Sequence, residues 1–233
     1  MLDMNAFANQ TNAGSNRRRH LLPEMEGMTA RWYARQRGTP SQLALYREQA
    51  ARLTAGLPDG AAVLEVAPGP GYFAIEVAKP ARARVIGLDI SRTMVEIARE
   101  NAASAGVTVD FQHGDATAMP FADDSFDLIV CQAAFKNFRQ PVSALDEMHR
   151  VLRPGGLAVI QDLRKEATRA EIDQEVRKQG QGAVNQFIVR RALAWLRSRA
   201  FSVDQFERLV AESRFGTCAI DAHGVELEVR LRA

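Results

Sequence analysis

The stretch that decides the fold is VLEVAPGPGYFAIEVA, which runs from Val63 to Ala78. It begins as a short apolar run, passes through a Gly-Pro-Gly turn and continues with the apolar spacing of a helix. A strand that enters a helix through a glycine-rich turn is typical of a doubly wound α/β sheet. Glu65 lies inside the apolar run, where an acid is rarely buried without a partner. The stretch therefore predicts a ligand site as well as a fold.

Similar apolar runs alternate with helical patterns along the chain, which predicts a parallel sheet with helices on both faces. The expected strands are residues 62–66, 84–88, 107–112, 127–132 and 157–163. The expected helices are residues 72–78, 92–105, 142–152 and 203–213. Two further strand-like runs meet at His223 and Gly224 and predict a C-terminal hairpin. We therefore expect a Rossmann-like, mostly parallel sheet of seven strands.

The remaining segments suggest one domain with a tail, a lid and a cap. Residues 1–22 are polar with little apolar periodicity, which predicts a flexible tail. Residues 23–233 are expected to form one domain. Its first part reads as helices broken at Gly38-Thr39-Pro40, and we expect these helices to cover the site as a lid. Residues 163–200 carry helical patterns with no strand between them, which predicts a helical cap after the fifth strand.

Composition and charge exclude several classes of function. Thirty basic and 28 acidic residues give a net charge of +2, too small a field to favour nucleic acid or anionic membrane as the main partner. Cys131 and Cys218 form neither a disulfide framework nor a metal-binding spacing. No apolar run approaches the roughly 18 residues of a membrane span. We expect a cytoplasmic monomer or homodimer without a metal or a membrane span.

Glycines and acids recur where ligands bind in such sheets. Gly69 and Gly71 fall at the turn after the first strand, where backbone can approach a ligand closely. Asp89 ends the next strand, 20 residues after Gly69, and its carboxylate can accept both hydroxyls of a ribose. The same glycines also satisfy the dinucleotide pattern G-x-G-x-x-G/A. These residues alone predict a nucleoside-containing cofactor and leave its identity open.

Two later stretches distinguish between the candidate cofactors. They are HGDATAMPFADDSFDLIVCQ, from His113, and EMHRVLRPGGLAVIQD, from Glu147. With them, the chain resembles class I S-adenosylmethionine (SAM)-dependent methyltransferases, small-molecule type, similar to the ubiquinone/menaquinone-biosynthesis methyltransferases. The resemblance spans about residues 63–163. It implies SAM as cofactor, with a pocket formed by Glu65, Ala67, Gly69, Gly71, Asp89, Ile90, Met94, Asp115, Ala116 and Gln132.

The chemistry of SAM accounts for the implied roles. SAM carries an ammonium and a sulfonium, so Glu65 at the methionine end is complementary, whereas it would repel a pyrophosphate. Asp89 would bind the ribose, Asp115 would accept the adenine amine and Met94 would cover the adenine ring. Ala67 departs from the family, which usually has Gly there. We expect its methyl group to be tolerated unless the residue needs a positive φ.

The acceptor side is less specific. Lys136 and Asn137 follow the fourth strand, where many relatives of the resembled family carry a His pair, and are the candidate catalytic residues. An ammonium there favours an anionic or phenolate-like acceptor, although both side chains could face solvent. The candidate substrate contacts are aromatic, and each could instead be core packing: Trp32, Tyr33, Phe135 and Phe138.

The function expected from these residues is transfer of the SAM methyl group to a small-molecule acceptor. One alternative is an RNA methyltransferase that uses the basic cluster Arg17, Arg18 and Arg19. Another is a protein that binds SAM without methylating, because the motifs concern binding and not turnover. An NAD oxidoreductase is disfavoured by Asp115-Ala116 and by the lack of a recognisable hydride-transfer constellation.

Overall fold

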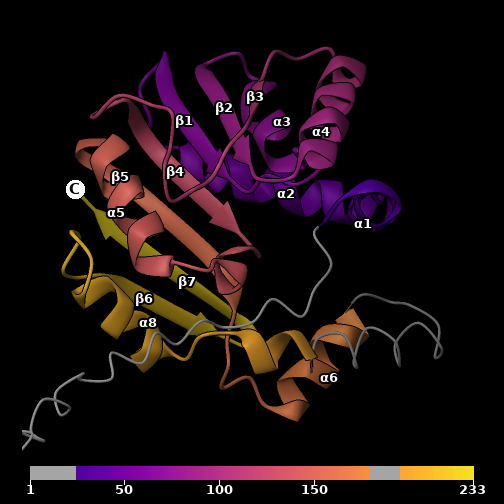
Figure 1. Cartoon of the computed structure of the whole chain (residues 1–233). Helices are drawn as coiled ribbons and strands as arrows, with labels where there is room; N and C mark the ends of the chain where they lie inside the picture. Colours follow the sequence, from indigo (N-terminus) through magenta and orange to yellow (C-terminus); the bar gives the residue numbers. More distant parts are fainter. Residues whose placement is uncertain (1–24, 179–194) are drawn as a thin grey trace, which may run out of the picture.

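A computed structural model describes residues 25–178 and 195–233, which form a seven-stranded sheet in the order β3-β2-β1-β4-β5-β7-β6 (Figure 1). The strands are β1 (Ala61–Val66), β2 (Ala83–Asp89), β3 (Asp110–His113), β4 (Phe126–Gln132), β5 (Leu152–Leu163), β6 (Ala219–His223) and β7 (Glu226–Arg232). Strands β1 to β5 pair in parallel, and β7 pairs antiparallel with both β5 and β6. The predicted mostly parallel, seven-stranded Rossmann-like sheet is confirmed.

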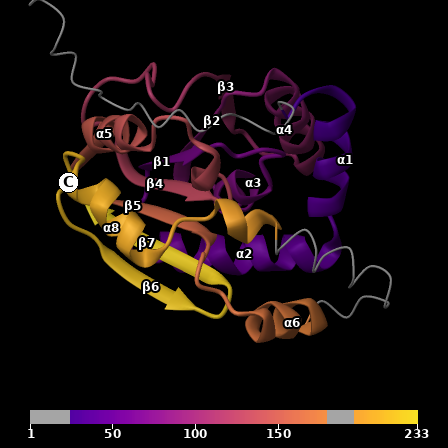
Figure 2. The same ribbon diagram turned by 60° about the horizontal axis from the view of Figure 1, so that its bottom comes forward.

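Helices cover both faces of the sheet, as predicted. They are α1 (Gly27–Arg37), α2 (Pro40–Thr54), α3 (Tyr72–Ala78), α4 (Arg92–Ala105), the 3-10 turn η1 (Phe135–Asn137), α5 (Pro141–Val151), α6 (Arg169–Lys178) and α8 (Val203–Ala211). Helices α2, α3 and α4 lie on one face, and α5 and α8 lie on the other (Figure 2). Alternate residues of β1 serve the two cores: Val63 packs toward α3, and Leu64 packs toward α5.

Two strands differ in length from the prediction. The edge strand expected at 107–112 is only Asp110–His113, because β2 offers partners to it from Ile86 onward. Gly106 ends α4 in a left-handed conformation, and Val107 then packs against the core without strand pairing. The strand expected at 157–163 begins at Leu152, which pairs with Phe126 across a register shift. The position of β3 at the edge of the sheet and the pairing of Leu152 with Phe126 therefore set the bounds of these two strands.

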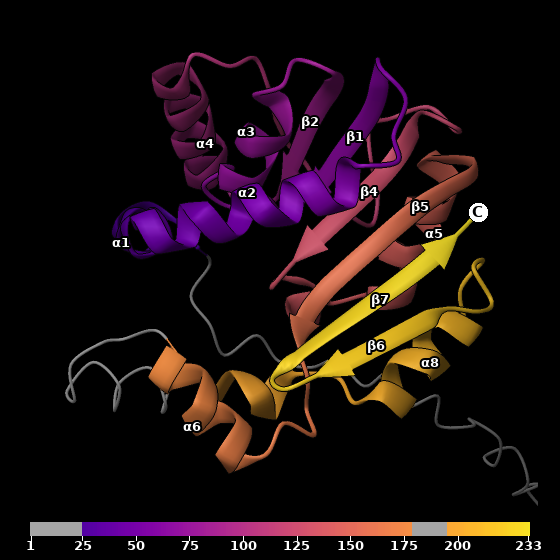
Figure 3. The same cartoon turned by 180° about the vertical axis from the view of Figure 1, so that it is seen from behind.

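The N-terminal helices pack on the α3 and α4 side of the sheet (Figure 3). Helix α1 ends at Arg37, Gly38 caps it, and α2 begins at Pro40, which confirms the predicted break. The Glu26 carboxylate, just before α1, accepts hydrogen bonds from the backbone N–H groups of Arg92 (2.9 Å) and Thr93 (3.1 Å) at the start of α4. The beginning of α1 is thereby tied to the first turn of α4.

The predicted cap is described only in part. Helix α6 lies within it and packs through Ile172 and Val176 against Val225, in the turn of the β6–β7 hairpin. Residues 179–194 and the predicted tail, 1–22, lie outside the described residues. No helix in 25–178 or 195–233 is long and apolar enough to cross a membrane.

Candidate functional site

The loop between β1 and α3 has an unusual backbone. Ala67, Gly69 and Gly71 have positive φ angles of 56°, 54° and 76°. A Cβ atom on Gly71 would lie 2.5 Å from Cζ of Phe111 and 2.9 Å from Cβ of Ala98, so this position requires glycine. We expected the methyl group of Ala67 to be tolerated unless this residue needs a positive φ. Ala67 does have a positive φ, so its side chain strains the backbone. The loop therefore holds one strained residue at the carboxyl edge of the sheet.

Glu65 is buried on the α3 face of β1, with an exposed fraction of 3%. Its Oε2 accepts the backbone N–H of Ala74 in the first turn of α3, at 3.0 Å. Burial raises the pKa of Glu65 to about 8. Among the described residues, no hydrogen-bond donor reaches its other oxygen, Oε1. Glu65 thus stabilises the start of α3 and keeps one oxygen for a ligand, preferably a cation.

Asp89 connects the glycine loop to the end of β2. Its Oδ2 accepts the backbone N–H of Gly69 at 2.9 Å, and its Oδ1 accepts that of Ser91 at 2.8 Å. Burial raises the pKa of this carboxyl group. Each oxygen still has lone pairs for ligand hydroxyls, so the geometry is compatible with the predicted ribose contact.

Four predicted cofactor residues lie around the ends of β2 and β3. Asp115 is exposed, and its Oδ1 accepts the backbone N–H of Thr117 at 2.9 Å, while Ala116 packs partly against the core. Met94 is buried against Ala30 and Ala34 of α1, so α1 covers the side chain that was expected to contact adenine. Ile90 is 67% exposed.

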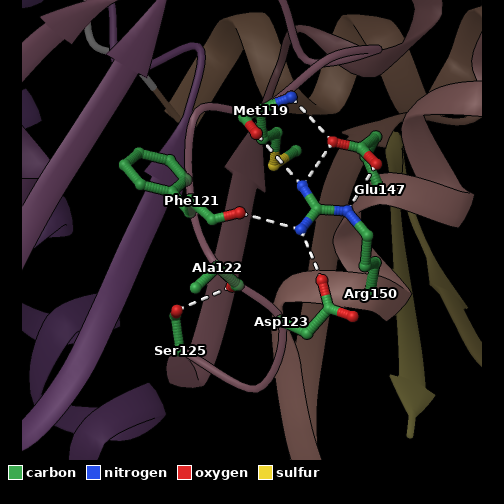
Figure 4. Close-up of polar contacts among 7 residues, drawn as sticks. All are labelled: Met119, Phe121, Ala122, Asp123, Ser125, Glu147 and Arg150. Carbon is green, nitrogen blue, oxygen red and sulfur yellow. Dashed lines mark hydrogen bonds and ion pairs between the residues drawn. The ribbon is translucent and has the colours of Figure 1, made fainter.

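The segment after Asp115 is held by Arg150 of α5, a contribution that sequence reasoning missed (Figure 4). The guanidinium donates to the carbonyls of Met119 (3.0 Å) and Phe121 (2.8 Å) and to the carboxylate of Asp123 (2.7 Å). Glu147 pairs with Arg150 at 2.7 Å and also accepts the N–H of Met119 at 2.7 Å. Hydrogen bonds from Arg150 lower the pKa of Glu147. In the sequence, the one sign of this contact was that Glu147 and Arg150 lie three residues apart on a predicted helix.

Gln132, at the end of β4, belongs to a row of polar side chains across the sheet. The strand register places Gln132 opposite Gln161, and Gln161 opposite Glu228. Nε2 of Gln132 donates to Oε1 of Gln161 at 2.6 Å, and Nε2 of Gln161 donates to Glu228 at 2.7 Å. Glu228 can only accept, so it fixes the orientation of both amides. Arg52 of α2 closes the row on Glu228 at 2.7 Å.

Lys136 already has an anionic partner. Its ammonium lies 2.7 Å from Oδ1 of Asp162, and both side chains are buried. Oδ2 of Asp162 also accepts the backbone N–H of Lys136 at 2.9 Å. We expected Lys136 to pair with the charge of an acceptor, and the structure instead uses that charge inside the fold. Oδ1 of Asn137 is buried without a hydrogen-bond partner in the described part of the chain, so its predicted role stays a prediction.

The aromatic candidates separate into two groups. Phe135 is fully buried, and its ring centroid lies 5.1 Å from that of Phe138 and 5.0 Å from that of Phe206. These rings belong to the core beneath α8, which is the alternative considered for them. Tyr33 lies beside the glycine loop, with Cε1 4.0 Å from the position that a Cβ of Gly69 would occupy. Trp32 is 62% exposed on α1.

The donor set suits SAM. Two buried acids, Glu65 and Asp89, lie beside a glycine loop, an arrangement that matches an ammonium and a ribose. In residues 25–178 and 195–233, no group of three or more His, Cys, Asp or Glu side chains could hold a metal ion.

Comparison with known sequences agrees with this chemistry. Residues 64–160 match the family model described as methyltransferase domain. The demethylmenaquinone methyltransferase of Deinococcus radiodurans is 40% identical over 99 residues, which are 42% of this chain and 41% of that protein. The chain thus matches about two fifths of the length of this curated relative.

Solved structures share the fold over more of the chain. A SAM-dependent methyltransferase from Aquifex aeolicus is 20% identical with a TM-score of 0.62, over 86% of this chain and 96% of that one. The [4+2]-cyclase SpnF is 19% identical with a TM-score of 0.54, over 82% of this chain and 80% of that one. At these identities the likeness establishes the fold alone, and the second name shows that this fold also serves other chemistry.

Proposed function

We propose that the chain is an enzyme that methylates a small-molecule acceptor with SAM, because residues 64–160 match the methyltransferase-domain model. The observation that carries the proposal is the placement of Glu65 and Asp89. Both acids are buried, they flank one glycine loop, and each keeps hydrogen-bonding capacity for a ligand. The coincidence of this geometry with the family match favours SAM as the ligand.

The proposed division of work follows from the chain's own groups. When bound, SAM supplies an electrophilic methyl group on a sulfonium sulfur. Glu65 holds the ammonium, Asp89 holds the ribose hydroxyls, and Asp115 accepts the adenine amine from a segment that Arg150 keeps in place. Gln132 lies at the strand end nearest the proposed acceptor side, with its amide oriented by the row that ends at Glu228. The glycine loop brings backbone close to the ligand.

Rate acceleration would come mainly from positioning. Methyl transfer is an in-line displacement, so an acceptor held in line near the methyl group reacts without the entropic cost of a random encounter. Lys136 is engaged with Asp162, and we therefore do not assign it as a base. An acceptor that is already nucleophilic, such as a phenolate or an enolate-like carbon, fits this arrangement.

The matched relatives suggest which acceptors to test first. The Deinococcus radiodurans protein is named for demethylmenaquinone. Hydroxylated aromatic compounds of low polarity are accordingly the first acceptor class that we propose.

The test is to incubate the chain with SAM that carries a deuterated methyl group and an extract of the source organism. We expect the label in a small molecule identified by mass spectrometry, and no label with heat-denatured chain. Label found only in RNA would support the nucleic-acid alternative. Binding of SAM with no labelled product would contradict the proposed activity.

A further inference from the structure

Arg37, the last residue of α1, is a guanidinium with an incomplete set of partners. Its Nε donates to the hydroxyl of Tyr46 at 2.9 Å, and its Cζ lies 5.3 Å from the centre of that ring. In the described part of the chain, no carboxylate forms an ion pair with it. Arginine has five N–H donors and is seldom placed away from water without an anion. Arg37 therefore has donors left for an anionic ligand.

The surroundings of Arg37 adjoin the glycine loop. The ring of Tyr46 packs 6.1 Å from that of Tyr72, the first residue of α3, directly after Gly71. The Tyr72 hydroxyl donates to the carbonyl of Ala34 at 3.2 Å, one helical turn before Arg37. These contacts place the end of α1 against the start of α3, next to the loop that is proposed to hold the methionine end of SAM.

Gly38 explains why Arg37 occupies this place. A Cβ atom on Gly38 would lie 2.5 Å from Oη of Tyr72 and 3.4 Å from the carbonyl oxygen of Ala34. A side chain at position 38 would therefore displace the Tyr72 hydroxyl from its present place. The predicted helix break thus places the end of α1, with Arg37, beside the first residue of α3.

Glu65 reaches the same turn of α3, because its Oε2 accepts the backbone N–H of Ala74, two residues after Tyr72. Burial is the largest cause that raises the pKa of Tyr46 to about 12, and the charge of Glu65 contributes to the same rise. A basic group, Arg37, and an acidic group, Glu65, are therefore both connected to the first turn of α3, Arg37 through Tyr46 and Tyr72.

We propose that Arg37 binds the α-carboxylate of SAM while Glu65 binds its α-ammonium. The inference rests on the proposed function and adds to it the recognition of the amino-acid moiety as a zwitterion. A planar guanidinium can form two parallel hydrogen bonds with a carboxylate, which a lysine cannot do. Lys136 is engaged with Asp162, so it does not compete for this role.

The test compares SAM with decarboxylated SAM, which lacks the carboxylate and keeps the ammonium, by calorimetric titration. The wild-type chain should bind SAM about tenfold to hundredfold more tightly than the decarboxylated compound. In Arg37→Met this preference should fall to within about threefold. Affinity for the decarboxylated compound should stay the same or increase, because a positive charge has been removed.

Arg35→Met is the matched control, since Arg35 is exposed on the same helix, and it should keep the wild-type preference. Arg37→Gln retains a donor toward Tyr46 and should behave like Arg37→Met if the folded structure is preserved. An equal loss of affinity for both compounds in folded Arg37→Met would make Arg37 structural and overturn the proposal.

Two other outcomes also decide the matter. An unchanged preference in Arg37→Met, with a raised KM for an anionic acceptor, would assign the site to the acceptor and overturn the inference. If the wild-type chain bound neither compound, the proposed function itself would fail, which is a different result from a failure at Arg37 alone.

Discussion

The ammonium of Lys136 lies 2.7 Å from the carboxylate of Asp162, and both side chains are almost completely buried. Lys136 follows β4 and Asp162 lies near the end of β5, so the pair joins the carboxyl ends of two neighbouring strands. Asp162 also accepts the backbone N–H groups of Lys136 (2.9 Å) and Leu163 (2.7 Å). The pair therefore determines the course of the chain beside the proposed acceptor side.

Removing the lysine alone should be strongly destabilising. Lys136→Met leaves the Asp162 carboxylate buried without its cation, and we expect a loss of about 3 to 5 kcal/mol in the free energy of unfolding. In Lys136→Met with Asp162→Asn, a neutral side chain can still accept backbone hydrogen bonds, so part of this loss should be recovered. Urea denaturation of the wild type, of Lys136→Met, of Asp162→Asn and of the double variant measures the coupling between Lys136 and Asp162.

The surface pair Arg82–Asp59 provides the control, and Arg82→Gln should cost less than about 1 kcal/mol. An equally small effect of Lys136→Met would contradict the buried pair. If the double variant folds and keeps wild-type kcat/KM, Lys136 has no role toward the acceptor.

Ala67 should respond to substitution in the opposite direction from an ordinary strand residue. Its φ of 56° costs a residue with a side chain about 1 to 2 kcal/mol, and glycine avoids this at an entropic cost of about 0.5 to 1 kcal/mol. Ala67→Gly should therefore raise the unfolding free energy by up to about 1 kcal/mol. Ala62→Gly, in β1, should lower it. Equal losses in both variants would argue against the left-handed backbone at Ala67.

Glu65 should make stability depend on pH. Its pKa is about 8 in the folded chain and near 4.5 when exposed, so between these values the folded state holds a proton that the unfolded state has released. Stability from this group is present at low pH and is lost as pH rises toward 8. Glu65→Gln does not titrate, and its stability relative to wild type should increase between pH 5 and pH 8. Parallel pH profiles of the two proteins would show that burial does not perturb Glu65.

Arg150 should control the segment that carries the adenine contacts. Arg150→Lys keeps the charge but loses the fork that contacts Met119, Phe121 and Asp123, and should cost about 2 kcal/mol or more. Amide hydrogen exchange in residues 115–123 should accelerate, and SAM should bind more weakly. Arg153→Lys alters an ion pair with Asp127 at the start of β4 and should leave SAM affinity unchanged. Unaltered amide hydrogen exchange of residues 115–123 in Arg150→Lys would show that Arg150 does not hold this segment.

The elements with strong local signals could be predicted from the sequence. The apolar runs, the glycine turn and the helix break at Gly38 and Pro40 are local features, and the structure has them where expected. The antiparallel hairpin is likewise present, with His223 paired to Glu226 across the turn. In these segments local preference and tertiary packing agree.

The side-chain contacts that could not be predicted are formed mostly between residues that are distant in the sequence. The partner of Lys136 is 26 residues away, and the two partners of Gln132 are 29 and 83 residues away, so these contacts leave no local pattern. Phe135 reads equally as a pocket wall or as core, and only the position of α8 distinguishes the two. The positive φ of Ala67 was hidden because the glycine expected there is replaced by alanine.

The central claim is that the carboxyl edge of this sheet is a SAM site, and calorimetric titration of the unmodified chain tests it most directly. The chain should bind SAM saturably at one site and should show no saturable binding of NAD. Saturable binding of NAD without binding of SAM would contradict the account.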